Sequence, residues 1–192
     1  MTVRVMLVSP ATSAALRQAR FESDAPLDEA GARRARAAAG ALPRADLFLS
    51  APSRRCRETA AELGATAGIR PELGDWDMGR WQGLRLEEVS EREPQAVAAW
   101  LSDPTAAPHS GESLAALCAR VGDWLHSLPD DTGRVLAVVD PAVVRATIVR
   151  ALALPPQAFW RLDVAPLTLT ELSGRSGRWN LRCGRVLGGE PV

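Results

Sequence analysis

Three short apolar runs, each ended by a polar turn and followed by a helical pattern, constrain the fold of this chain more than any other feature. They cover residues 3–8, 47–49 and 135–139, and the last is the most apolar segment of the chain. Such runs are typical of buried strands, and their alternation with helices predicts a sheet with helices on its faces. We therefore expect an α/β fold, a three-layer α/β/α sandwich with a mixed, mainly parallel central sheet. Residues 1–192 are expected to form one domain.

The segments around these runs predict the covering helices and a terminal hairpin. Residues 112–128 give the clearest amphipathic pattern, because apolar residues recur there at three- and four-residue steps. Asp28 and Ser53 are placed to cap helices at their N-termini. The predicted helices are residues 26–42, 53–63, 86–101, 112–128 and 141–152, and the predicted hairpin joins residues 167–172 to 179–183.

Charge and cysteine content exclude several functional classes. The 23 basic and 23 acidic residues cancel, so no overall field favours nucleic acid or a membrane as partner. Every basic residue is arginine, so an anion site must use guanidinium or backbone N–H groups. Three widely spaced cysteines favour neither a disulfide framework nor a zinc knuckle, and the N-terminus does not resemble a signal peptide. We expect a cytoplasmic protein without cofactor, whose partner is a small ligand or another protein; a homodimer stays open.

Polar side chains gather where the predicted strands end. Residues 9–13 follow the first strand, residues 50–55 follow the second, and Asp140 follows the third. Two further loops, around Asp75 and around His109, can border the opening of a pocket at these strand ends, which we call the mouth. Ligands bind at this edge of open α/β sheets, so we expect the functional site there.

Four motifs in a fixed order carry a family resemblance. They are LSAPSRRCRETAAEL (residues 49–63), GDWDMGRWQGL (74–84), PHSGESLAAL (108–117) and VLAVVDPAVVRATI (135–148). In this order the chain resembles the histidine phosphatase superfamily, which includes phosphoglycerate mutases and α-ribazole phosphatases. On that resemblance Arg55 is the phosphate-binding arginine, Asp75 takes the position of the acid, and Glu112 lies in the helix start that resembles Gly-Gly-Glu-Ser.

The chain departs from the family pattern at the residues that perform the chemistry. Ser9, Pro10 and Ala11 stand where the family has Arg-His-Gly, whose histidine is the nucleophile. Asp140 stands where the second histidine is expected. Proline has no side-chain lone pair, and an aspartate adds negative charge where a phosphate would bind. The resemblance therefore implies a degenerate member that lacks both catalytic histidines.

The charged candidates each allow two interpretations. Arg55 either binds an anion or forms an internal salt bridge with Asp140, and the charge argument favours the salt bridge. Asp140 is either a general base or the cap of the helix that starts at Pro141, and the cap is favoured because aspartate is a preferred N-cap. Asp75 is a proton donor or a turn residue, with no preference between them.

The remaining candidates are weaker. Ser9, Thr12 and Ser13 are candidate ligand contacts, and one could replace the nucleophile, although no base is placed to activate it. Arg17 and Arg20 either restore positive charge to the mouth or are solvated. His109 is a mouth residue or, as we favour, a solvated loop histidine, and His126 is expected at the surface. A metal site formed by Asp75, Asp140 and His109 has no support from their spacing.

Three functions remain in view. The leading hypothesis is a degenerate histidine-phosphatase-like protein that binds a small anionic or phosphorylated ligand, or a partner, through the old active-site pocket. The first alternative is an enzyme with a rebuilt pocket that uses Asp75 and Asp140. The second alternative is a weak phosphatase acting on small phosphomonoesters, for which α-ribazole phosphate would indicate cobalamin metabolism.

Overall fold

A six-stranded sheet in the order β3-β2-β4-β1-β5-β6 forms the centre of the computed structural model. The model describes residues 2–21, 24–175 and 177–188. The strands are β1 (Val3–Val8), β2 (Leu47–Ser50), β3 (Gly68–Ile69), β4 (Arg134–Val138), β5 (Thr168–Arg175) and β6 (Arg178–Val186). The neighbours β3, β2, β4 and β1 are parallel, whereas β5 is antiparallel to both β1 and β6. The prediction of a mixed, mainly parallel sheet is confirmed.

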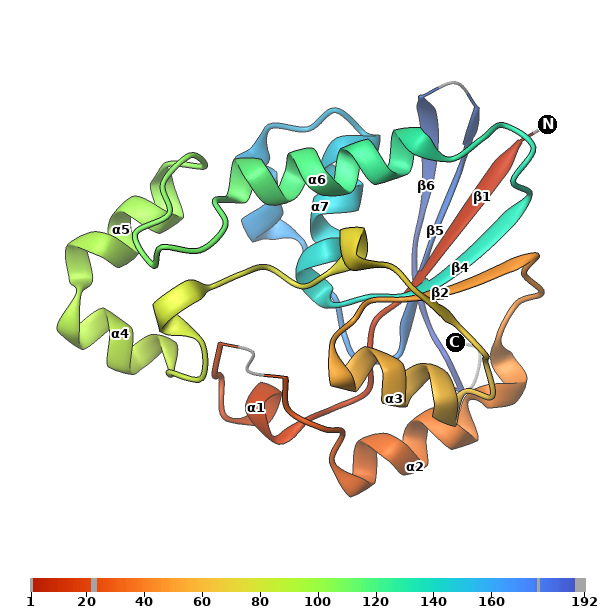
Figure 1. Ribbon diagram of the computed structural model, residues 1–192, viewed down its shortest axis with the longest axis horizontal. Coiled ribbons are helices and arrows are strands. Elements are labelled where there is room, and N and C mark those ends of the chain that lie inside the picture. Colours follow the sequence, from red (N-terminus) through yellow and green to blue (C-terminus); the bar gives the residue numbers. More distant parts are fainter. Residues whose placement is uncertain (1, 22–23, 176, 189–192) are drawn as a thin grey trace.

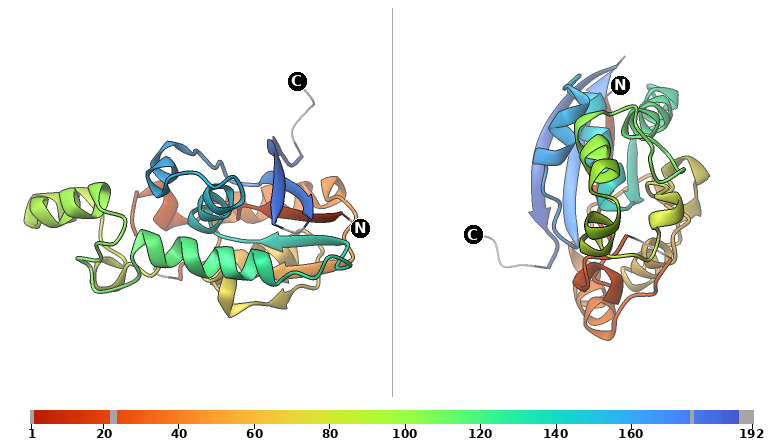
Figure 2. Two further views of the ribbon diagram at one scale, coloured as in Figure 1. Left: turned by 90° about the horizontal axis from the view of Figure 1, so that it is seen from above. Right: turned by 90° about the vertical axis from the view of Figure 1, so that its left-hand side faces the viewer.

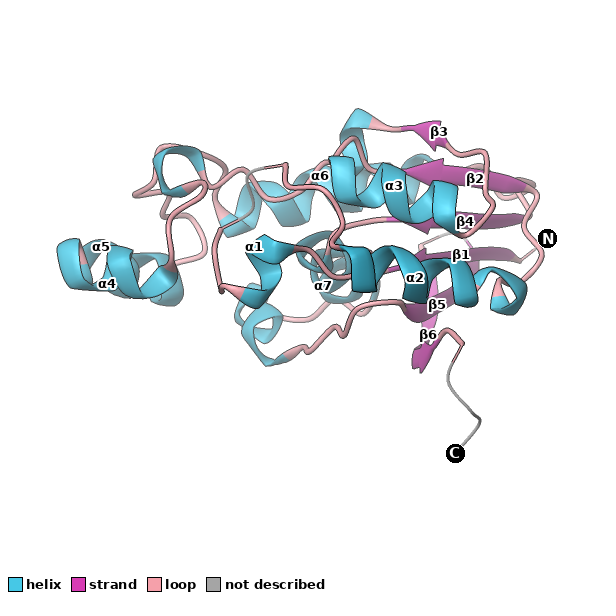
Figure 3. Cartoon of the chain, turned by 90° about the horizontal axis from the view of Figure 1, so that it is seen from below, coloured by secondary structure: helices cyan, strands magenta, loops and turns pink. Residues whose placement is uncertain are grey.

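Helices cover both faces of this sheet (Figure 1). α6 (Leu114–Ser127) and α7 (Pro141–Ala151) pack against each other and lie on the side of the molecule that faces the viewer when it is seen from above (Figure 2). Seen from below, α2 (Glu29–Ala37) and α3 (Arg54–Glu62) lie in front of the strands (Figure 3). Asp28 caps α2 as predicted, since its side chain accepts a hydrogen bond from the Gly31 N–H. The short helix α1 (Ala14–Arg17) and four 3-10 turns complete the helical segments: Ala39–Ala41, Pro71–Leu73, Gly79–Trp81 and η4 (Pro156–Arg161).

The helix predicted over residues 86–101 is wrong in one respect, because it is two helices. They are α4 (Leu86–Arg92) and α5 (Pro94–Ser102), and together they project from the body of the protein (Figure 1). The break falls at Glu93, whose φ and ψ of −138° and 54° are not helical. A proline disfavours the helical conformation in the residue before it, so Pro94 starts a new helix. Trp100 of the resulting arm packs against Trp76 and Trp160.

Parallel register brings the expected loops to one edge. Val138 of β4 is level with Val8 of β1 and with Ser50 of β2. The residues that follow all three strands therefore emerge together, beside the start of α7. No helix in the described part of the chain is both long and apolar enough to cross a bilayer.

The segment around Asp75 packs closely against the loop before α6. A Cβ added to Gly111 would lie 2.1 Å from the Asp77 carbonyl oxygen, and one added to Gly79 would lie 2.2 Å from the His109 carbonyl oxygen. Gly79 also has a φ of +46°, which a residue with a side chain adopts only under strain. These contacts require glycine at both positions and fix the loop that carries Asp75.

Replacing Gly111 with alanine should destabilise the protein, because the new methyl group meets backbone rather than a movable side chain. We expect the free energy of unfolding to fall by about 1–3 kcal/mol, measured by urea unfolding followed through tryptophan fluorescence. Gly40→Ala is the matched control, because no atom lies within 4 Å of its added Cβ. Equal stability of the two variants would contradict the close packing of this loop.

Candidate functional site

Arg55 lies at the floor of the site, where it pairs with the carboxylates of Asp140 and Asp75. It projects from the first turn of α3 and is 6% exposed. Its Nε donates to Asp140 Oδ1 over 2.6 Å, and its Nη2 lies 3.3 Å from Asp75 Oδ2. The predicted salt bridge between Arg55 and Asp140 is therefore confirmed. The guanidinium that would face a phosphate in the family is neutralised by groups of the protein itself.

Asp140 occupies the N-cap position of α7, but the preference for a capping side chain is wrong. Its backbone has the extended conformation of an N-cap, yet its side chain makes no capping hydrogen bond. One carboxylate oxygen accepts from Arg55, and the other accepts from the Ser53 hydroxyl over 2.9 Å. A hydrogen bond to a charged guanidinium stabilises a buried carboxylate more than a neutral backbone N–H does. Ser53, predicted to cap α3, likewise makes no capping bond.

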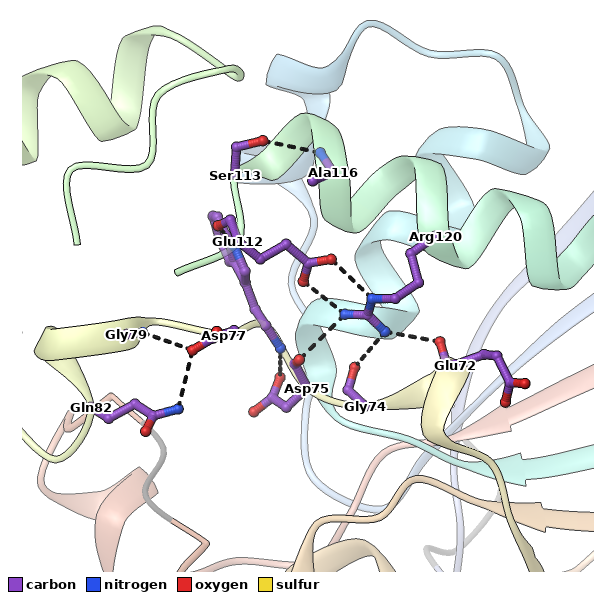
Figure 4. Close-up of polar contacts among 11 residues, drawn as sticks. Glu72, Gly74, Asp75, Asp77, Gly79, Gln82, Glu112, Ser113, Ala116 and Arg120 are labelled. Carbon is purple, nitrogen blue, oxygen red and sulfur yellow. Dashed lines mark hydrogen bonds and ion pairs between the residues drawn. The ribbon is translucent and has the colours of Figure 1, made fainter. Parts of the chain in front are cut away.

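Asp75 is held in place by the backbone and by an arginine that the sequence did not reveal. Its Oδ1 accepts from the Trp76 N–H over 2.8 Å. Arg120 of α6 donates to the carbonyl oxygens of Glu72, Gly74 and Asp75, and forms a two-pronged ion pair with Glu112 (Figure 4). Glu112, a candidate ligand contact in the sequence, pairs with Arg120 and lines neither of the two compartments described below. The loop is thereby tied to α6 by charge-assisted hydrogen bonds.

Two adjoining cavities open above this floor, and Asp75 and Trp76 line both. The acidic compartment has a volume of about 450 Å³ and is lined by Asp24, Pro52, Ser53, Asp75, Trp76, Asp77 and Gln82. The aromatic compartment has a volume of about 260 Å³. It is lined by Leu16, Arg20, Phe21, Arg55, Asp75, Trp76, Met78, Trp100, Pro141, Ala142, Arg145, Phe159 and Trp160. We call the two together the cleft.

Of the polar residues after β1, Arg20 lines the aromatic compartment, whereas Ser9, Thr12, Ser13 and Arg17 line neither compartment. The Ser9 hydroxyl donates to the Ala165 carbonyl oxygen over 2.5 Å and accepts from the Thr168 N–H over 2.9 Å, which joins β1 to β5. The Thr12 hydroxyl donates to Asp28, and Ser13 caps α1. Arg17 lies 3.3 Å from Asp28. Each of these four expected ligand contacts therefore has a structural partner away from the cleft.

His109 is not the solvated loop histidine that we favoured, because its side chain is buried. Its Nδ1 accepts from the Gly111 N–H, and its ring packs 5.1 Å from that of Trp81, centroid to centroid. Burial lowers its pKa below the ordinary value of 6.5. His126 is exposed on α6, as predicted. Neither histidine lines the cleft.

Sequence reasoning missed most of the aromatic compartment. Arg145 stands in the V-x-R-A pattern of residues 135–148, and that motif was the available signal for it. Trp100, Phe159 and Trp160 lie outside all four motifs, so no signal pointed to them. Within the described residues, no group of three histidine, cysteine or acidic side chains is arranged to hold a metal ion.

Comparisons with known proteins agree on one family. Residues 11–185 match the model of the histidine phosphatase superfamily (branch 1). A glucosyl-3-phosphoglycerate phosphatase of Mycobacterium tuberculosis is 32% identical over 183 residues, covering 82% of each chain. The adenosylcobalamin/α-ribazole phosphatase of Salmonella typhimurium is 28% identical over 148 residues, covering 72% of this chain and 73% of the relative. The native structure of a mycobacterial glucosyl-3-phosphoglycerate phosphatase has a TM-score of 0.81 at 26% identity, covering 94% of this chain and 97% of that one.

Removing the Asp140 carboxylate should destabilise the fold strongly, because Arg55 would lose its closest buried counter-charge. We expect Asp140→Ala to lower the free energy of unfolding by about 3 kcal/mol in urea. Glu62→Ala is the control, since it breaks a surface ion pair with Arg36, whose side chain is 67% exposed. Similar losses in both variants would show that the buried pair has no special role in stability.

His109 should make stability depend on pH, with the loss of stability setting in as the pH falls through about 6.5. The unfolded chain binds a proton as the pH falls through 6.5, while the buried ring in the folded state resists protonation. The free energy of unfolding should therefore fall on acidification, and His109→Asn should reduce that loss. His126→Asn, on the exposed face of α6, should not, and urea unfolding at several pH values measures both. An unchanged pH slope in His109→Asn would contradict this assignment.

Proposed function

The chain belongs to the histidine phosphatase superfamily (branch 1), and on that premise we propose that its cleft binds a small anionic or phosphorylated ligand without phosphohistidine chemistry. The observation that carries the proposal is the position of the two histidines that the sequence contains. His109 is buried behind tryptophan rings and His126 is exposed on α6. Pro10 takes the nucleophile's place in the sequence pattern and offers no lone pair.

The charge of the floor supports weak rather than tight binding of phosphate. Arg55 is shared by Asp140 and Asp75, and the acidic compartment adds Asp24 and Asp77. Two like charges about 4 Å apart repel by roughly 4 kcal/mol at an effective dielectric of 20. A phosphate dianion that approaches Arg55 therefore meets carboxylates that already satisfy the cation.

Hydrolysis of small phosphomonoesters is the second candidate, and the names of the relatives support it more directly than they support binding alone. Glucosyl-3-phosphoglycerate and α-ribazole phosphate are the candidate substrates on that reading, and the latter would place the chain in cobalamin metabolism. Asp75 lines both compartments at the position of the family's acid, so it is the candidate proton donor. Asp140 is buried and lines neither compartment, which favours Asp75 over Asp140 in a rebuilt enzyme as well.

Hydrolysis of 4-nitrophenyl phosphate from pH 4 to 9 separates the two candidates. The binding proposal predicts no turnover in the wild type. A phosphatase would turn the substrate over and lose about 10²-fold or more in Asp75→Asn, while Asp123→Asn, exposed on α6, would stay fully active. That second pattern would overturn the binding proposal and establish the second candidate.

Neutralising Asp140 should improve phosphate binding. We expect Asp140→Asn to tighten the binding of inorganic phosphate at least about tenfold in calorimetry, because it removes a charge that competes for Arg55. The amide retains an oxygen that can accept a hydrogen bond from the Ser53 hydroxyl, so Asp140→Asn should disturb the site less than Asp140→Ala does. Unaltered or weaker phosphate binding in Asp140→Asn would contradict the role given to this carboxylate.

A further inference from the structure

Aromatic side chains from three separate segments form one continuous wall of the aromatic compartment. Trp76 comes from the Asp75 loop, Trp100 from α5, and Phe159 and Trp160 from η4. Ring centroids are 4.7 Å apart for Trp100 and Trp160, 5.4 Å for Trp76 and Trp100, and 5.3 Å for Trp76 and Phe159. Trp76, Trp100 and Phe159 are buried and Trp160 is half-buried, so Trp160 presents the most ring surface, and aromatic rings favour stacked or edge-to-face contact with another planar ring.

Arg145 is one of three arginines that line this compartment, together with Arg20 and Arg55. It projects from α7, is half-buried, and places its guanidinium carbon 5.6 Å from the centroid of Phe159. Within the described residues Arg145 has no hydrogen bond or ion pair, and its Nε is buried without a partner. Burial lowers the pKa of the guanidinium, and nearby Asp163 only partly opposes that effect. A partly desolvated cation that forms no ion pair within the described residues is a recognition group for an anion.

The other arginines of the compartment are engaged by the protein itself. Arg20 donates to the Gln18 side chain and to the Gly83 carbonyl oxygen. Arg55 is already paired with Asp140 and Asp75, and Asp75 lines the compartment itself. A dianion would meet that carboxylate, whereas a carboxylate group matches the one charge of Arg145 and its forked N–H donors. The volume of about 260 Å³ lies just below the usual range for small-molecule pockets, about 300–1,000 Å³, and suits a ligand of one or two rings.

We infer that the aromatic compartment binds a planar aromatic carboxylate, with its ring against Trp100 and Trp160 and its carboxylate on Arg145. The inference deepens the proposed function, on whose cleft it rests, by naming the class of ligand. Arginine fixes the anionic end and the tryptophans select a flat ring, so neither feature alone accounts for the site.

Calorimetry with simple probes tests the ligand class on the wild-type protein. The probe is 2-naphthoate, and it should bind at least about tenfold more tightly than cyclohexanecarboxylate, which has the charge but no aromatic ring. Its affinity should also be higher than that of 2-naphthol, which has the ring but no charge, and than that of phenyl phosphate, which carries a second charge. If cyclohexanecarboxylate or 2-naphthol bound as tightly as 2-naphthoate, the inference would be overturned. If phenyl phosphate bound more tightly than 2-naphthoate, the inferred carboxylate would be wrong and the anionic group of the ligand would be a phosphate.

Matched variants test the residues. Arg145→Met should weaken 2-naphthoate binding about tenfold or more, because it removes the charged donor but keeps the length of the side chain. Trp160→Leu should weaken it as well, and both variants should also lose the thermal stabilisation given by the probe. Arg150→Met, exposed on the same helix, and Trp179→Leu, on β6, should bind within about twofold of the wild type. Wild-type affinity in Arg145→Met would overturn the inference even if Trp160→Leu failed to fold.

The results also distinguish this inference from the proposed function. If inorganic phosphate binds and responds to Asp140→Asn but 2-naphthoate does not bind, the proposed function stands and the inference fails. If 2-naphthoate binds through Arg145 while phosphate and phosphomonoesters neither bind nor react, the inference stands and the phosphorylated ligand is excluded.

Discussion

The buried ion pair between Arg55 and Asp140 is the interaction on which the site depends. It joins the first turn of α3 to the residue before α7, and Asp75 adds a third charged group from a distant loop. A buried charge is costly unless it is paired and hydrogen-bonded, so the three side chains and Ser53 hold one another in place. The floor of the cleft is consequently closed by the protein's own carboxylates.

Because Arg55 is already paired at the floor, ligand binding depends on side chains elsewhere in the cleft. Arg55 is satisfied within the protein, whereas Arg145 has no hydrogen bond or ion pair in the described part of the chain and lies over the Phe159 ring in the aromatic compartment. Arg120 and Glu112 fix the Asp75 loop from behind, and Gly79 and Gly111 allow it to pack closely. The fold is similar to those of phosphatases. It presents an aromatic compartment that contains Arg145 beside an acidic compartment.

The fold was predictable from the sequence because strands and helices follow from local periodicity, and the pair of Arg55 and Asp140 followed from motif order and charge. Environments set by distant packing were not predictable. The burial of His109 depends on Trp76 and Trp81 closing over it, and the hydroxyl of Ser9 is taken by Ala165 and Thr168, far along the chain. Pro94 lies inside the apolar pattern of residues 86–101, which favours one continuous helix, and the proline divides that helix in two. Trp100 and Trp160 meet only in the folded state.

Intact-protein mass spectrometry after incubation with a phosphoryl donor such as 4-nitrophenyl phosphate tests the absence of phosphohistidine chemistry most directly. A transferred phosphoryl group would remain on the enzyme as a covalent intermediate, detectable after rapid quenching at alkaline pH, where phosphohistidine is stable. The arrangement of Pro10, His109 and His126 predicts that the mass stays unchanged. A phosphorylated protein whose label maps to either histidine would contradict it.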